Sequence, residues 1–162
     1  TGLSDPEMPA VTADAEATIV MHMRGNPQTM GAQTKSQDVV SEVRDWLLSR
    51  ASLSRSAVTW IDPGIGFAKT AEQSLALLGG VEQLTSTGLP VLIGASRKSF
   101  IGHVLRLPDP ATRLSGSLAA AAAAWLGGAQ ALRVHDVAET RQLLDLLHAI
   151  NQAGQVGPDS IP

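Results

Sequence analysis

Short apolar runs alternate with longer, helix-forming segments along this chain. Runs rich in β-branched and apolar residues predict buried strands at 18–23, 58–61, 91–94 and 131–136. The segments between and after them predict helices at 36–51, 70–85, 113–126 and 138–150, with a short helix before the first strand and a helical turn at 100–105. Strands that alternate with helices at this spacing are parallel and joined by helical crossovers, so the pattern predicts an α/β fold.

Local signals mark the ends of several predicted elements. Thr70 followed three residues later by Gln73 is the pattern of a capping box, and Gly127-Gly128 is typical of a helix C-terminus. Beyond the last predicted helix the sequence is polar and rich in Gly and Pro. The predicted divisions are one domain at 1–150 and a flexible tail at 151–162.

Unusual polar residues lie at the carboxyl end of each predicted strand. They are His22, Asp62, the run from Ser96 to Ser99, Arg133 and His135. Because parallel strands present their carboxyl ends at one edge of the sheet, these side chains are expected to converge where α/β folds bind ligands. Arg133 and His135 alternate along one predicted strand and are expected to share a face.

The segment after the second predicted strand carries the clearest signal of a ligand site. That strand ends on Asp62, and a buried carboxylate is costly there unless a partner satisfies it. Pro63 fixes one backbone angle, and Gly64 and Gly66 permit turns that a side chain would forbid. Phe67 is one of two Phe in the chain and is expected at the mouth of the site.

Composition limits the kinds of protein that this chain can be and the partners that it can bind. The chain has 162 residues, of which 44% are hydrophobic, enough for one domain with a core. A net charge of −3 without a basic block argues against nucleic acid as a partner. No apolar run reaches the roughly 18 residues that a membrane span needs. Cysteine is absent, which excludes disulfides and thiolate chemistry and favours a cytoplasmic location.

Four ordered motifs resemble those of the dihydropteroate synthase family. They lie at 21–30, 62–69, 94–102 and 133–140, in the family's order and spacing. The resemblance implies a TIM (β/α)8 barrel, of which this chain is similar only to the C-terminal half, strands five to eight. The family's functional residues on strands one, three and four, and its two flexible substrate loops, have no counterpart in this sequence.

The resemblance implies a reaction of folate biosynthesis. The family joins 6-hydroxymethyl-7,8-dihydropterin pyrophosphate to p-aminobenzoate and is the target of sulfonamides. It implies Mg²⁺ as a cofactor, with the expected ligand in the absent N-terminal half and no metal ligand in this segment. It also implies a homodimer when the barrel is complete, and the segment alone is expected to be inactive.

The same resemblance assigns roles to residues of the four motifs. The expected catalytic residues are Lys98, Asp62 and Arg133. Pterin binding is assigned to Asp62, Lys98, Arg133 and Met21, pyrophosphate binding to Arg133 and His135, and p-aminobenzoate binding to Gly66, Phe67, Lys98 and Ser99. Supporting roles are expected for Arg97, Lys69 and His22.

Each assignment has a chemical rationale, and each residue also has a purely structural interpretation. As a ligand-binding group, the Asp62 carboxylate would accept two parallel N–H bonds from an aminopyrimidinone edge. As a turn cap, it would need no ligand. A hydroxyl at a helix start binds a carboxylate, but Ser99 can equally be an ordinary N-cap. A guanidinium and an imidazole suit a pyrophosphate. The structural interpretation is a solvated lysine for Lys98, a structural histidine for His135, and a core residue for Met21 and Phe67.

Two further functions remain open from the sequence. One is a related barrel that transfers a methyl group from methyltetrahydrofolate. The stretches 96–99 and 133–136 argue against it, because they suit aminobenzoate and pyrophosphate. The second is a non-catalytic, truncated fragment, since four parallel strands would leave two open sheet edges.

Overall fold

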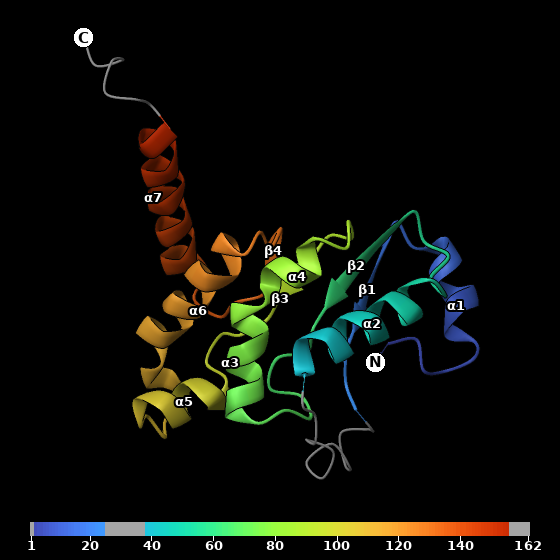
Figure 1. Cartoon of the computed structure of the whole chain (residues 1–162), viewed down its shortest axis with the longest axis horizontal. Helices are drawn as coiled ribbons and strands as arrows, with labels where there is room; N and C mark the ends of the chain where they lie inside the picture. Colours follow the sequence, from blue (N-terminus) through green and yellow to red (C-terminus); the bar gives the residue numbers. More distant parts are fainter. Residues whose placement is uncertain (1, 25–37, 156–162) are drawn as a thin grey trace.

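The computed structural model describes residues 2–24 and 38–155 (Figure 1). The strands found there are β1 (Ala17–Met21), β2 (Val58–Asp62), β3 (Leu92–Ile93) and β4 (Ala131–Leu132). β1 pairs with β2 and β3 pairs with β4, in both cases in parallel. A parallel bridge between Ile61 and Val91 joins the two pairs. The predicted α/β fold with parallel strands is confirmed.

Helices separate the strands along the chain. Within the described ranges they are α1 (Met8–Val11), η1 (Thr12–Asp14), α2 (Val39–Ala51), α3 (Ala71–Gly79), α4 (Val81–Thr85), α5 (Ser99–Leu105), η3 (Pro110–Thr112), α6 (Leu114–Leu126) and α7 (Val137–Gln155). α2 packs on β1, β2 and α3, and α6 packs on α3, α5 and α7. Figure 1 shows α7 projecting away from the body formed by the other elements. In the described part of the chain, no helix combines the length and the apolar character that crossing a membrane requires.

The core lies between the strands and the helices that cover them. Val20, Ile61 and Ile93 are almost completely buried on the strands. Leu47 on α2 and Leu77 on α3 are completely buried against the same cluster. Full burial of an aliphatic side chain contributes about 1.5–3 kcal/mol relative to leaving it exposed, so this cluster fixes the strand ends that carry the polar residues.

The helix predicted at 70–85 is interrupted at Gly80. α3 ends before this residue and α4 begins after it. A Cβ at Gly80 would lie 2.8 Å from Cγ1 of Val40, so the break lies where α2 packs closely on the turn. The predicted capping box at the start of α3 is confirmed. Thr70 Oγ1 accepts from the Gln73 N–H at 3.2 Å, and Gln73 Oε1 accepts from the Thr70 N–H at 3.1 Å.

The last predicted strand is too long. β4 ends at Leu132, and the Arg133 N–H makes the last ladder bond, to the Ile93 carbonyl oxygen. The His135 N–H donates to the Ser96 hydroxyl, so a side chain replaces the ladder beyond this point. Arg133 and His135 therefore both follow β4, and the expectation that they alternate along one strand is wrong.

The predicted C-terminal boundary also changes. α7 continues to Gln155, although the sequence pattern ends the helix at Ile150. Residues 151–155 are thus helical, and the rest of the predicted tail, 156–162, lies outside the described residues. Residues 25–30 of the first motif and the first two residues of the helix predicted at 36–51 also lie outside the described residues.

Candidate active site

Asp62 occupies the centre of the polar edge of the sheet. It is the last residue of β2, lies directly opposite Met21 in the strand register, and is only 6% exposed. Its Oδ1 accepts the N–H of Gly64 at 2.7 Å, and its carbonyl oxygen accepts the N–H of His22 at 2.9 Å. Asp62 therefore does cap a turn, and it does so while facing the cluster of cations described next.

Three cations act on the Asp62 carboxyl. Burial raises the pKa of Asp62, whereas the Gly64 N–H and the nearby charges of Lys98, Arg133 and Lys69 lower it. A buried carboxylate beside several cations is a costly arrangement for a purely structural role. Perturbed groups of this kind mark candidate functional sites in clefts.

The turn after Asp62 needs glycine at two positions. Gly64 has φ +64°, and a Cβ there would lie 1.9 Å from the His22 carbonyl oxygen. Gly66 has φ +78°, and a Cβ there would lie 3.0 Å from Cδ of Lys98. Both positions combine a left-handed backbone with a close neighbour, so the predicted need for glycine is confirmed.

Lys98 lies over this turn rather than in open solvent. Its ammonium donates to the carbonyl oxygen of Ile65 and lies 4.3 Å from the centroid of the Phe67 ring. Burial lowers the pKa of Lys98 to about 8, with Asp62 opposing the shift and Arg133 adding to it. The interpretation of Lys98 as a solvated lysine is therefore wrong, and Lys98, Asp62, Gly66 and Phe67 form one group.

Replacing Lys98 by methionine should change how stability depends on pH. The pKa of Lys98 is about 8 in the folded protein and 10.5 ordinarily, so between these values the unfolded chain binds more protons at this residue. The free energy of unfolding of the natural chain should therefore rise relative to Lys98→Met as pH increases. We expect a relative gain of roughly 1–2 kcal/mol between about pH 7 and about pH 10, discounted for partial exposure.

Urea titrations at the two pH values measure this difference. The matched control is Arg106→Met, which removes an exposed cation at the end of α5 and should show no such pH-dependent gain. A difference between the natural chain and Lys98→Met that stays constant with pH would contradict a buried Lys98 ammonium.

Arg133 and His135 line the same cavity despite the early end of β4. The cavity has a volume of about 480 Å³, and its walls include Gly94, Lys98, Arg133 and His135. The Arg133 side chain packs against Gly94: a Cβ placed on Gly94 would lie 3.4 Å from Nε of Arg133. The Nδ1 of His135 lies 3.0 Å from the Ser96 hydroxyl. The chain thus brings together the two residues assigned to pyrophosphate, with Lys98 at the same wall.

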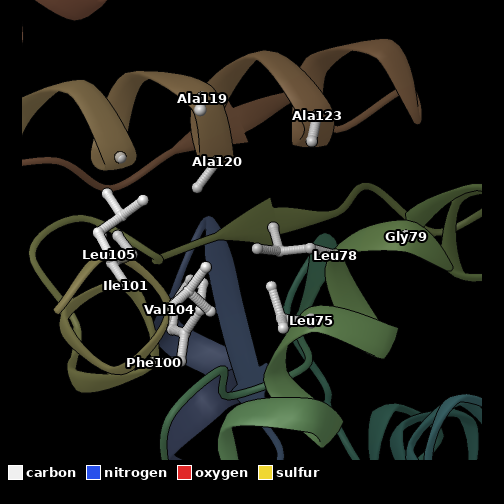
Figure 2. A pocket seen from close by; sticks show the side chains of 11 residues that line it. Leu75, Leu78, Gly79, Phe100, Ile101, Val104, Leu105, Ala119, Ala120 and Ala123 are labelled. Atoms are coloured by element: carbon white, nitrogen blue, oxygen red, sulfur yellow. The ribbon is translucent and has the colours of Figure 1, made fainter.

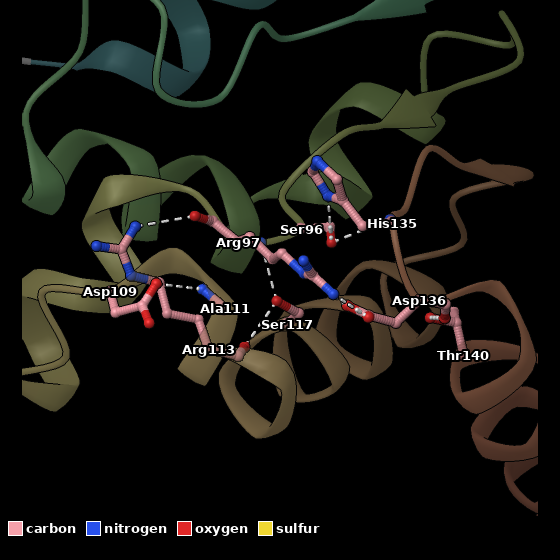
Figure 3. A network of polar contacts seen from close by, with 9 residues as sticks. All are labelled: Ser96, Arg97, Asp109, Ala111, Arg113, Ser117, His135, Asp136 and Thr140. Atoms are coloured by element: carbon pink, nitrogen blue, oxygen red, sulfur yellow. Dashed lines mark hydrogen bonds and ion pairs between the residues drawn. The ribbon is translucent and has the colours of Figure 1, made fainter.

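An ion pair at the wall of this cavity joins the segment after β3 to the segment after β4 (Figure 3). The guanidinium of Arg97 pairs with both carboxylate oxygens of Asp136. The Arg97 N–H donates to the Ser117 hydroxyl, and Arg113 donates to the Arg97 carbonyl oxygen, both at 2.9 Å. Arg97 therefore has the ion-pair role expected for it, and Asp136 pairs with it rather than with His135.

Ser99 is not a helix N-cap. It is the first residue of α5, whereas Lys98 is the N-cap and makes no side-chain cap bond. Ser99 instead lines a cavity of about 230 Å³ with Lys69, Thr70 and His103. The interpretation of Ser99 as an N-cap is therefore wrong, and its cavity is separate from the one that contains Arg133.

Met21 and His22 complete the edge at the end of β1. Met21 is half-buried, and its Cγ lies 3.5 Å from a Cβ placed on Gly64. His22 is almost completely buried, its ring lies edge-on to Trp46 at 4.8 Å, and its Nδ1 contacts Lys69. Supporting roles were expected for His22 and Lys69, but no signal in the sequence indicated that they touch each other.

An apolar groove lies on the outer side of the molecule (Figure 2). It has a volume of about 330 Å³ and runs between α3, α5 and α6. Its walls include Leu75, Leu78, Phe100, Val104 and Leu105, and none of its lining residues is titratable. It offers nothing to bind a charged substrate, so the candidate site is the polar edge around Asp62.

The chain matches one family over most of its length. The family model described as pterin binding enzyme matches residues 1–135. A dihydropteroate synthase from Synechocystis is 43% identical over 152 residues, which cover 90% of this chain and 53% of the relative. The chain spans about half the length of the curated relatives it matches.

Solved structures of dihydropteroate synthases have the same fold as this chain. The enzyme from Thermus thermophilus in complex with 4-aminobenzoate has a TM-score of 0.88 at 41% identity, over 93% of this chain and 64% of that one. The enzyme from Xanthomonas albilineans in complex with 7,8-dihydropteroate has a TM-score of 0.83 at 32% identity, over 99% and 58% respectively. The resemblance and the partial barrel predicted from the sequence are confirmed.

Proposed function

Because the chain belongs to the pterin binding enzyme family, we propose that it forms part of the active site of a dihydropteroate synthase. The reaction joins the methylene carbon of 6-hydroxymethyl-7,8-dihydropterin pyrophosphate to the amine of p-aminobenzoate. The observation that carries the proposal is a buried Asp62 facing Lys98 and Arg133 at the edge of a half-barrel. Its relatives in the Synechocystis and Thermus genera are dihydropteroate synthases.

Asp62 and Lys98 bind and orient the pterin. An ionised carboxylate accepts two N–H bonds from the aminopyrimidinone ring, and such charge-assisted pairs are stronger than neutral ones. The Lys98 charge acts on Asp62, and its Nζ lies 4.3 Å from the centroid of the Phe67 ring, so its ammonium can contact both the pterin and the second substrate. Met21, which is half-buried beside the turn, packs on the pterin.

Arg133 and His135 receive the pyrophosphate. Both line the cavity of about 480 Å³, and the guanidinium is a fixed cation with several donors. The bond between the methylene carbon and the pyrophosphate oxygen breaks first, and the electron pair leaves with the pyrophosphate. Cationic side chains that stabilise this developing charge lower the barrier to bond breaking.

Gly66, Phe67 and Ser99 place p-aminobenzoate. The Phe67 ring and the bare backbone of Gly66 face an aromatic ring, while the Ser99 hydroxyl binds the carboxylate. The amine nitrogen then forms the new carbon–nitrogen bond and loses one proton, which gives 7,8-dihydropteroate. No covalent intermediate with the enzyme is required, so the main contributions of the site are positioning and charge stabilisation.

The expected Mg²⁺ is assigned to the half of the barrel that this chain does not span. Over residues 2–24 and 38–155 no group of three or more His, Asp or Glu side chains is arranged to hold a metal ion. The proposal attributes each step to the side chains named above.

The proposal extends to inhibitors, assembly and location. Sulfonamides are expected to compete with p-aminobenzoate around Phe67 and Ser99. A homodimer of the completed barrel is expected, with the small residues of α6 as a contact. We expect a cytoplasmic protein, because the chain contains no cysteine.

Product formation by a reconstituted enzyme tests the proposed function. The 162-residue chain alone should form no 7,8-dihydropteroate, because it spans about half the length of its relatives and the resemblance assigns part of the site to the strands that it lacks. A mixture with a fragment that covers strands one to four of the Synechocystis relative should form it, as measured by chromatography of the product. This mixture is the reconstituted enzyme.

Matched halves of the Synechocystis relative are the positive control for assembly. Product from those halves but not from the reconstituted enzyme would contradict the proposed function. Product from the chain alone would refute the requirement for the other strands. Tight binding of methyltetrahydrofolate, with no binding of the pterin pyrophosphate, would favour methyl transfer instead.

A further inference from the structure

The ammonium group of Lys69 joins three points of the site. Its Nζ lies 2.9 Å from Nδ1 of His22, 3.0 Å from the carbonyl oxygen of Gly64 and 3.0 Å from that of Phe67. His22 directly follows β1, whereas Gly64 and Phe67 bracket the turn after β2. One side chain thus ties the end of β1 to both ends of the turn that contains Gly66.

These contacts use all the donors that Lys69 has. A lysine ammonium carries three N–H groups and no acceptor, and it faces three acceptors here. Burial lowers the pKa of His22 to about 3, so its ring is neutral and Nδ1 can accept while Nε2 carries the proton. Lys69 therefore has no N–H left for a substrate and acts through the backbone that it holds.

The residue that directly follows the turn held by Lys69 has strained backbone. Ala68, between Phe67 and Lys69, has φ +51°, and it is only 4% exposed. A non-glycine residue in the left-handed region costs about 1–2 kcal/mol, so surrounding contacts must maintain this conformation. The bond from Lys69 to the Phe67 carbonyl oxygen is directly next to the strained residue and holds the backbone from which the Phe67 ring extends.

Lys69 also lies on the side of the site assigned to the second substrate. It lines the cavity of about 230 Å³ together with Ser99, whereas Arg133 and His135 line the other cavity. The Lys69 charge acts on Asp62, but the hydrogen bonds of Lys69 go to His22, Gly64 and Phe67, whereas Asp62 is held by the β2 ladder and by the Gly64 N–H. Loss of Lys69 should therefore disturb the aromatic amine more than the pterin.

We propose that Lys69 is a positioning residue for the aromatic amine substrate, acting through the Gly64–Phe67 turn. This inference rests on the proposed function and adds a residue to which that function assigns no contact with substrate. Burial lowers the pKa of Lys69 to about 7; Arg24 and Lys98 add to the shift, and Asp62 and Glu42 oppose it. The three acceptors around Nζ favour the protonated form of the Lys69 side chain.

Steady-state kinetics of Lys69→Met in the reconstituted enzyme tests the proposal. Methionine keeps an unbranched side chain of similar length but has no donor. We expect the KM for p-aminobenzoate to rise about 10-fold, while the KM for the pterin pyrophosphate and kcat change less than about twofold. The control is Arg141→Met, which removes an exposed cation on α7 and should leave all three constants unchanged.

Hydrogen exchange of the 162-residue chain supplies a second measurement that needs no activity. Lys69→Met should speed exchange of the amides at 64–68 about 10-fold and leave those of α6 unchanged. An unchanged KM for p-aminobenzoate together with unchanged exchange at 64–68 would overturn the proposal. Equal increases in both KM values would also overturn it, because they indicate general damage to the site. Failure of the reconstituted enzyme that carries the natural chain to form product, while the matched Synechocystis halves form it, would instead count against the proposed function.

Discussion

Asp62→Asn in the reconstituted enzyme should lower kcat/KM for the pterin pyrophosphate about 1000-fold. The amide offers one acceptor and one donor where the carboxylate offers two acceptors, so a pterin N–H loses its partner and an NH₂ group opposes it. A lost charge-assisted pair with an unsatisfied buried donor costs about 4 kcal/mol, which corresponds to this factor. The KM for p-aminobenzoate should change little, because Phe67 and Ser99 are untouched.

The fold should survive the Asp62→Asn substitution. The Asn side-chain oxygen can still accept the Gly64 N–H that Oδ1 of Asp62 accepts at 2.7 Å. Replacing a buried carboxylate whose pKa is raised by burial removes a desolvation cost as well. Urea unfolding should therefore give a free energy within about 1 kcal/mol of the natural chain.

A matched substitution on the surface completes this comparison. Asp145→Asn breaks an exposed pair with Arg141 on α7 and should leave product formation unchanged. If Asp62→Asn kept more than about a tenth of the natural kcat/KM, Asp62 would not be the pterin acceptor and would be only the turn cap.

Arg133→Met should lower kcat about 100-fold, with little change in the KM for p-aminobenzoate. The guanidinium lines the pyrophosphate cavity and acts on charge that develops as the carbon–oxygen bond breaks. Removing one such group from a preorganised site costs about 3 kcal/mol in the transition state. Methionine keeps most of the Arg133 side-chain volume that packs against Gly94, so the packing there should change little.

Product inhibition gives a direct measurement of the pyrophosphate contact. Added pyrophosphate should inhibit the natural enzyme, and Arg133→Met should weaken that inhibition at least about 10-fold, since a charge-assisted contact is lost. Arg55→Met removes an exposed cation before β2 and should change neither kcat nor the inhibition by pyrophosphate. A loss of kcat with unchanged pyrophosphate inhibition would place Arg133 outside the pyrophosphate site.

The sequence predicted most of the fold because the signals involved are local. Alternating strands and helices, the capping box at Thr70 and the glycines of the turn each depend on residues a few positions apart. Parallel strands then had to gather their carboxyl ends at one edge, so the convergence of Asp62, Lys98 and Arg133 followed from the order of the elements. The assigned roles of these residues remain proposals.

Elements that depend on contacts distant in sequence were not predicted. The break at Gly80 arises where Val40 of another helix packs on the turn, and β4 ends early because Ser96 takes the His135 N–H. Ser99 also proved to follow the N-cap rather than to form it. For Gly80 and for β4 the deciding partner lies on a different segment, and periodicity along one segment carries no information about it.

The sequence by itself determined that a carboxylate would end β2 next to a glycine turn, since backbone sterics and strand order suffice for that. Only the tertiary structure decided what holds the turn. Lys69 and His22 are 47 residues apart, yet their side chains lie within 2.9 Å. Their hydrogen bond exists because two adjacent parallel strands place their ends side by side, and a buried ammonium must find acceptors wherever the packed chain supplies them.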